Sequence, residues 1–202
     1  MCHLLMRGGW MMVPLVLCSL VVVTIIVERF LFFRRIGSSS RIDEVLALVR
    51  SGRAAQAGDV ANEVLSVTPS PVMRVLSMGI AHAAEPGAAM EAQGIHELSS
   101  MRRGLVALDT IITLSPLLGL LGTIIGMIDS FHVMEISGLG QPHAVTGGVA
   151  EALICTAAGI MVAVITLIPY NYFMARIDRE AESIEAYANR LEAAFSAAPK
   201  VL

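Results

Sequence analysis

The chain has 202 residues, of which 55% are hydrophobic and only 15% are charged, with a formal net charge of −3. A soluble globular domain carries about 25% charged residues, so the deficit indicates a protein that faces lipid. The chain has no basic stripe for nucleic acid, and its three cysteines, Cys2, Cys18 and Cys155, form neither a disulfide framework nor a C-x-x-C pair. We therefore expect no nucleic-acid partner, no metal site and no cofactor.

The first apolar run, from Trp10 to Phe33, predicts a transmembrane helix over residues 10–33. About 20 apolar residues cross a bilayer. A cleaved signal peptide would end in a site with small residues, whereas Arg34 and Arg35 follow here, as in a stop-transfer flank. We expect a retained helix, preceded by a short external segment over residues 1–9.

Residues 34–104 regain charge and predict a helical insert. One amphipathic face is made by Ile42, Val45, Leu46 and Val49. Prolines at 69, 71 and 86 predict breaks between short helices. A segment of about 70 residues is too small to form a large core of its own.

Two further uncharged runs predict the second and third transmembrane helices, over residues 105–134 and 147–175, joined by a loop at 135–146 that contains glycine, proline and histidine. Residues 176–202 predict a C-terminal helix that extends the third span beyond the membrane. Its apolar residues recur at heptad-like spacing, so we expect them to pack against a neighbour: Ile177, Ala181, Ile184, Ala188, Leu191 and Phe195.

Arginine and lysine predict the orientation. Residues 34–103 contain eight arginines and the tail contains Arg176, Arg179, Arg190 and Lys200, whereas the 135–146 loop has none and the N-terminal segment has only Arg7. The positive-inside rule places the insert and the tail in the cytoplasm and the other two segments outside. The sequence therefore predicts an all-α membrane protein whose long helices extend into the cytoplasm.

Three carboxylates lie in or beside the apolar runs. An ionisable group within a membrane is a functional candidate by default. Asp109 and Asp129 flank the uncharged core of the second span, which is typical of hydrated charges at helix ends. Glu151 follows several small and apolar residues. It is either a carboxylate facing a polar lumen, where it could bind or relay a cation, or an interfacial anchor.

Small and hydroxylated residues accompany these carboxylates. Gly119, Gly122 and Gly126 form a small face on the second span, and Gly159 does so on the third. Such faces let membrane helices pack closely. Thr123 and Thr156 either offer polar steps beside Glu151 or bond to carbonyls of their own helices. We find no nucleophile elbow, phosphate-binding loop or dinucleotide motif and expect no enzyme.

Two stretches carry a resemblance to a known family. Residues 105–131 read LVALDTIITLSPLLGLLGTIIGMIDSF, and residues 148–159 read GVAEALICTAAG, followed by IPYNYF at 168–173. Both resemble the MotA/TolQ/ExbB proton channel family, and the three-span layout is similar to ExbB and TolQ. Ser115 and Cys155 depart from the residues usual there. The resemblance carries ion-path roles onto Thr123, Glu151 and Thr156, and a structural role onto Pro116 and the glycines.

The resemblance also implies a biological setting. A pentamer in the bacterial inner membrane, with the N-terminus in the periplasm, would surround an ExbD/TolR-like single-span partner that brings an essential aspartate. Proton flow would then drive a TonB/TolA-like protein that spans the periplasm. Two alternatives stay open at this point: a structural scaffold that conducts no ions, and an intramembrane enzyme or transporter, against which the absence of an internal repeat argues.

Overall fold

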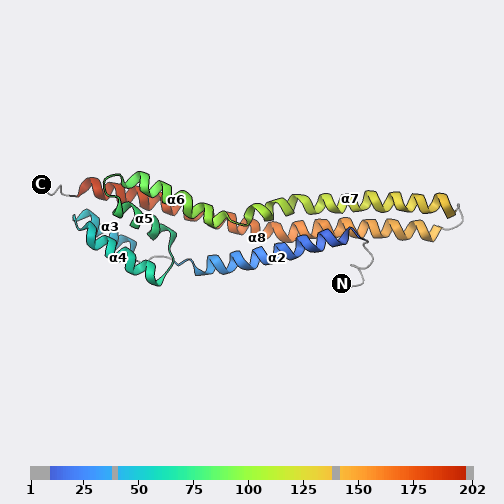
Figure 1. Cartoon of the computed structure of the whole chain (residues 1–202), viewed down its shortest axis with the longest axis horizontal. Coiled ribbons are helices and arrows are strands. Elements are labelled where there is room, and N and C mark those ends of the chain that lie inside the picture. Colours follow the sequence, from blue (N-terminus) through green and yellow to red (C-terminus); the bar gives the residue numbers. More distant parts are fainter. Residues whose placement is uncertain (1–9, 38–40, 138–141, 199–202) are drawn as a thin grey trace. The chain divides into compact units, whose positions relative to one another are not determined.

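The computed structural model describes residues 10–37, 41–137 and 142–198, and over these ranges it contains seven α-helices and no β-strand (Figure 1). The expectation of an all-helical chain is confirmed. Three helices are long and apolar enough to cross a membrane, as predicted: α2 (Met12–Arg35), α7 (Leu105–Ser137) and α8 (Pro142–Ala197). The expected external segment at 1–9 and residues 138–141 of the expected loop lie outside the described residues.

The chain divides into two compact units. The apolar unit comprises the described residues up to Glu28 together with 104–172, and the insert unit comprises 29–103 together with the described residues from 173 onward. Helices α2 and α8 each contribute to both units, whereas α7 lies wholly in the apolar unit. The two units are described separately below.

In the apolar unit, the N-terminal part of α2 packs on α7 and α8. Its buried residues Met12 and Leu15, with Met11 just before the helix, form a cluster with Cys155 of α8. Three partly buried residues border that cluster: Leu118, Ile125 and Ala158. Many other large apolar side chains of the three helices are exposed, as expected for surfaces that meet lipid or other subunits.

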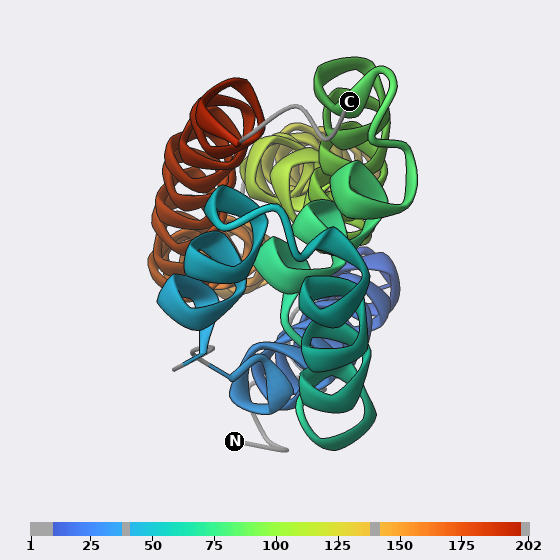
Figure 2. The same ribbon diagram turned by 90° about the vertical axis from the view of Figure 1, so that its left-hand side faces the viewer.

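The insert unit contains four short helices: α3 (Ile42–Arg50), α4 (Ala54–Val67), α5 (Pro71–Ala81) and α6 (Pro86–Arg102). Figure 2 shows these helices end-on, beside the last part of α8. The predicted face of α3 is buried. Helices α5 and α6 begin with Pro71 and Pro86, and Ser70 caps α5 by accepting a hydrogen bond from the Met73 N–H at 3.3 Å.

The core of the insert unit is completed by the C-terminal part of α8. Three of its residues, Ile184, Leu191 and Ala194, are buried in one cluster with apolar residues of α3, α4 and α5. Ala188 and Phe195 pack against this cluster. The neighbour expected for the heptad-like stripe is therefore the chain's own insert. This explains how a segment too short for a large core becomes stable, because a long helix supplies part of its wall.

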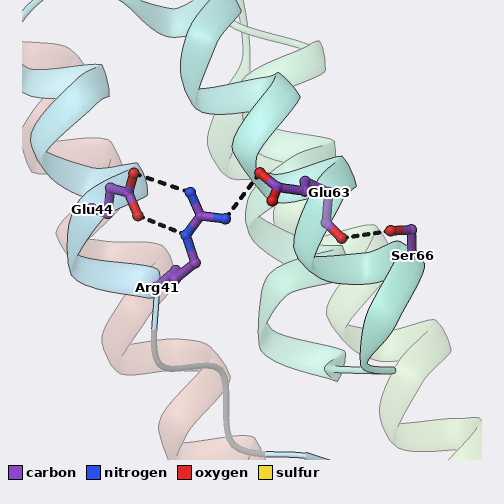
Figure 3. Close-up of polar contacts among 4 residues, drawn as sticks. All are labelled: Arg41, Glu44, Glu63 and Ser66. Carbon is purple, nitrogen blue, oxygen red and sulfur yellow. Dashed lines mark hydrogen bonds and ion pairs between the residues drawn. The ribbon is translucent and has the colours of Figure 1, made fainter.

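An ion-pair network joins α3 and α4 on the surface of the insert. Arg41 donates to Glu44 at 2.7 Å and to Glu63 at 2.9 Å (Figure 3). The hydrogen bonds to these carboxylates raise the pKa of Arg41, and the bond from Arg41 holds the pKa of Glu44 below its usual value. Because these groups are exposed, we expect the network to respond to pH and salt.

Candidate functional site in the apolar helix pair

Glycines bring α7 and α8 into close contact along one line. A Cβ placed on Gly119 would lie 2.9 Å from the Thr156 Cα, and one on Gly126 would lie 2.9 Å from the Ala152 Cβ. A Cβ on Gly122 would collide with the Cys155 side chain, and one on Gly159 would collide with the backbone oxygen of Ser115. Backbones this close are typical of membrane helices that associate through small residues.

The two threonines of interest use their hydroxyl groups differently. Thr156 donates to the backbone oxygen of Gly119 at 2.8 Å, so it bonds across from α8 to α7. Thr123 donates to the oxygen of Leu120 in its own helix at 2.6 Å. Since the Thr156 proton is already committed to a carbonyl, its oxygen presents lone pairs and acts toward any further group as an acceptor.

A small cavity of about 40 Å³ lies beside this contact line, and two carboxylates line it. Asp129 comes from α7 and Glu151 from α8. The remaining lining residues are apolar or small: Trp10, Met11, Gly122, Ile125, Gly126, Ala152 and Cys155. The volume is sufficient for water, and the two carboxylates supply polar partners for it.

The depth of Glu151 follows from where α8 begins. The helix begins at Pro142, five residues before the expected start of the third span, so Glu151 lies inside the helix, beyond its first two turns. Its side chain is exposed in the single chain. A carboxylate on an exposed helical face within an apolar segment requires water, a counter-ion or another subunit around it.

Sequence reasoning missed that Asp129 lies at the same cavity as Glu151. It treated Asp129 as a hydrated charge at a helix end, together with Asp109. The signal lay in the packing glycines, since Asp129 follows Gly126 by three residues and Gly126 packs against Ala152, the neighbour of Glu151. Asp109 is exposed near the start of α7 and does not line this cavity.

Pro116 lies inside α7, where it removes one backbone donor and leaves the carbonyl of Ile112 without its helical partner. The buried hydroxyl of the preceding Ser115 donates to the carbonyl of Ile111. Gly159 of α8 approaches the Ser115 carbonyl, so the proline lies one residue from a tight helix contact. Across the described ranges, no three His, Cys, Asp or Glu side chains are grouped closely enough to hold a metal ion.

Comparison with known proteins assigns this helix pair to a family. The model of the MotA/TolQ/ExbB proton channel family matches residues 70–186, which is more than half of the chain and includes α7 and the apolar part of α8. The chain belongs to the MotA/TolQ/ExbB proton channel family. All three predicted ion-path residues lie within the matched region.

Three relatives with ExbB or TolQ names are similar to this chain over different shares of its length. The ExbB-like protein 3 of Synechocystis sp. is 33% identical over 194 residues, which is 94% of this chain and 92% of the relative. The biopolymer transport protein exbB1 of Vibrio cholerae is 30% identical over 77% of this chain and 71% of its own length. The Tol-Pal system protein TolQ of Pseudomonas aeruginosa is 33% identical over 48% of this chain and 42% of its own.

Family membership and the three apolar helices together identify a multi-pass membrane protein of the biopolymer-transport or Tol-Pal kind. The family is a channel-type motor family rather than an enzyme family.

Proposed function

We propose that the chain is an inner-membrane motor subunit that uses the proton motive force to energise outer-membrane transport or envelope maintenance. The observation that carries the proposal is the cavity lined by Asp129 and Glu151, beside the Thr156–Gly119 hydrogen bond, within an otherwise apolar helix pair. Helix packing alone does not require carboxylates at this place. Ionisable groups within a membrane cost free energy, so their presence marks a functional site.

The proposed ion path comprises Glu151, Thr156 and Thr123. Glu151 supplies a negative potential and takes a proton transiently. Thr156, whose hydroxyl proton is held by Gly119, accepts hydrogen bonds from a water molecule or a protonated group on its lone pairs. Thr123 offers a second polar step on α7. The main protonation site is an aspartate of the partner, which this chain does not supply.

The proposed assembly is a pentamer around an ExbD/TolR-like single-span protein, coupled to a TonB/TolA-like protein that crosses the periplasm. The exposed apolar side chains of α7 and α8 support an assembly in which these helices meet other subunits or lipid. In the proposed orientation the N-terminus is periplasmic, and the arginine-rich insert and the C-terminus are cytoplasmic.

A complementation assay tests this proposal in cells that lack the endogenous subunit. Glu151→Gln removes the titratable group from the cavity, and Asp109→Asn is a control because that carboxylate lies on α7 outside the cavity. We expect Glu151→Gln to abolish partner-dependent transport or envelope maintenance, with membrane insertion and assembly intact. Equal activity of both variants and the wild type would contradict the proposal.

The alternative of a non-conducting scaffold is favoured by one feature, the use of the Thr156 hydroxyl as a link between helices. The two functions differ in their response to Thr156→Ser, which keeps the hydroxyl, and Thr156→Val, which removes it. A scaffold tolerates both changes as long as the assembly forms, whereas an ion path loses conduction in Thr156→Val alone.

A further inference from the structure

A second, larger cavity lies in the insert unit, and the proposed ion path does not use it. Its volume is about 350 Å³, within the range of pockets that hold small ligands. It is lined by the segment after α2, the beginnings of α3 and α5, and one face of α8. Its polar and charged lining residues are Ser70, Arg176, Arg179, Glu180, Ser183 and Tyr187.

Arg176 is the residue in this cavity that indicates a ligand. Its Nε atom is buried and has no hydrogen-bond partner in the part of the chain that the structure describes. A guanidinium group keeps its charge at any physiological pH, so it cannot lower the free-energy cost of burial by losing a proton. A buried, unpartnered donor of this kind calls for an anion or an ordered polar group nearby.

The other lining groups extend the donor set. Arg179 donates its Nε–H to the oxygen of Ala175 at 3.0 Å, which leaves the rest of its guanidinium available. Val72, in the first turn of α5, also lines the cavity, and its N–H has no carbonyl partner within the helix. One carboxylate, Glu180, offsets part of the charge, so the lining carries two arginines against one glutamate.

The position of Arg176 along α8 places the cavity near a membrane surface. Arg176 is the first charged residue after the uncharged run of residues 152–175, which at 1.5 Å per residue is about as long as the hydrocarbon core is thick. Phosphate groups of lipids lie at this level. The segment after α2 is also held here, since the Gly37 N–H donates to the oxygen of Pro69 at 3.3 Å.

We propose that this cavity binds a phosphate group, with Arg176 as the main ligand and Arg179 as the second cationic group. Arginine suits this role because its planar fork donates two parallel hydrogen bonds to phosphate oxygens. The same chemistry is offered by the headgroup of an anionic phospholipid and by free phosphate. Binding would tie the base of the third span to the insert helices that line the cavity.

The test compares phosphate sources on the purified full-length protein in its extracted oligomeric form. Phosphatidylglycerol, phosphatidylcholine and inorganic phosphate are titrated separately, and binding is measured by native mass spectrometry and by the shift in thermal unfolding midpoint. Arg176→Gln is compared with Arg50→Gln, which removes the same charge from an exposed position of α3 outside the cavity. Ser183→Met, which adds bulk at the lining while keeping both arginines, is a second variant.

We expect Arg176→Gln and Ser183→Met each to weaken binding about 10-fold or more, equivalent to about 1.4 kcal/mol, and Arg50→Gln to leave it unchanged. Because the side chain of Arg176 is half-buried and its buried Nε has no hydrogen-bond partner among the described residues, Arg176→Gln should fold as well as the wild type without ligand. Binding of phosphatidylglycerol alone identifies a lipid headgroup site, and binding of inorganic phosphate identifies a site for free phosphate. The proposal is overturned if neither binds, or if Arg50→Gln weakens binding as much as Arg176→Gln does.

Discussion

Replacement of Gly119 by alanine tests the packing that underlies the candidate site. The added Cβ would lie 2.9 Å from the Cα of Thr156 and 3.1 Å from the oxygen of Cys155, whereas ordinary contacts begin at 3.4 Å. Both neighbours are backbone atoms, so α7 and α8 must separate by about half an ångström. The same movement stretches the 2.8 Å bond from Thr156 to the Gly119 oxygen.

The expected magnitude follows from three contributions. Overpacking of a close contact costs about 1–3 kcal/mol. A weakened hydrogen bond between membrane helices adds about 0.6 kcal/mol. The higher helix propensity of alanine offsets about 0.8–1 kcal/mol of this. We therefore expect Gly119→Ala to lower the free energy of unfolding by about 0.6–2.8 kcal/mol.

Gly147→Ala is the matched control, because a Cβ there would meet no atom within 4 Å. This change should be neutral or slightly stabilising, since only the helix-propensity gain remains. The assay is reversible unfolding in mixed micelles with increasing SDS, followed by circular dichroism. Equal stability of the two alanine variants would refute the inferred contact between α7 and α8.

Three further predictions concern the insert unit. Arg29→Gln removes contacts of the Arg29 side chain with the Ser100 and Met101 oxygens at 3.2 and 3.5 Å, so hydrogen exchange at the end of α6 should accelerate, by about 10-fold if about 1.4 kcal/mol is lost. Arg74→Met leaves the buried Glu97 without its cation at 3.2 Å and should lower stability in thermal unfolding by about 2 kcal/mol or more, an effect that Glu97→Met in the same chain should largely reverse. Because the pKa of Glu44 is lowered in the folded chain, its pair with Arg41 stabilises the fold above the unfolded pKa and is lost as pH falls through the folded pKa. Glu44→Gln should therefore flatten the decline of the unfolding midpoint from pH 5 to pH 3, and an unchanged decline would contradict this assignment.

Features that depend on local chemistry could be predicted from the sequence. The buried face of α3 follows from apolar residues at helical spacing, and the starts of α5 and α6 follow from Pro71 and Pro86. Length and apolarity likewise predicted three helices able to cross a membrane.

Features that depend on the register between helices could not be predicted in the same way. The bond from Thr156 to Gly119 and the shared cavity of Asp129 and Glu151 both require knowing which turn of α7 faces which turn of α8.

The central claim, that the α7–α8 pair forms part of a proton path, is tested most directly by proton flux. The subunit is reconstituted into vesicles with its single-span partner, and flux under an imposed proton gradient is compared for the wild type, Glu151→Gln and Asp109→Asn, with assembly verified for each. The account predicts that Glu151→Gln abolishes flux and that Asp109→Asn retains it. Undiminished flux through an intact Glu151→Gln assembly would contradict the account and leave these residues with a packing role.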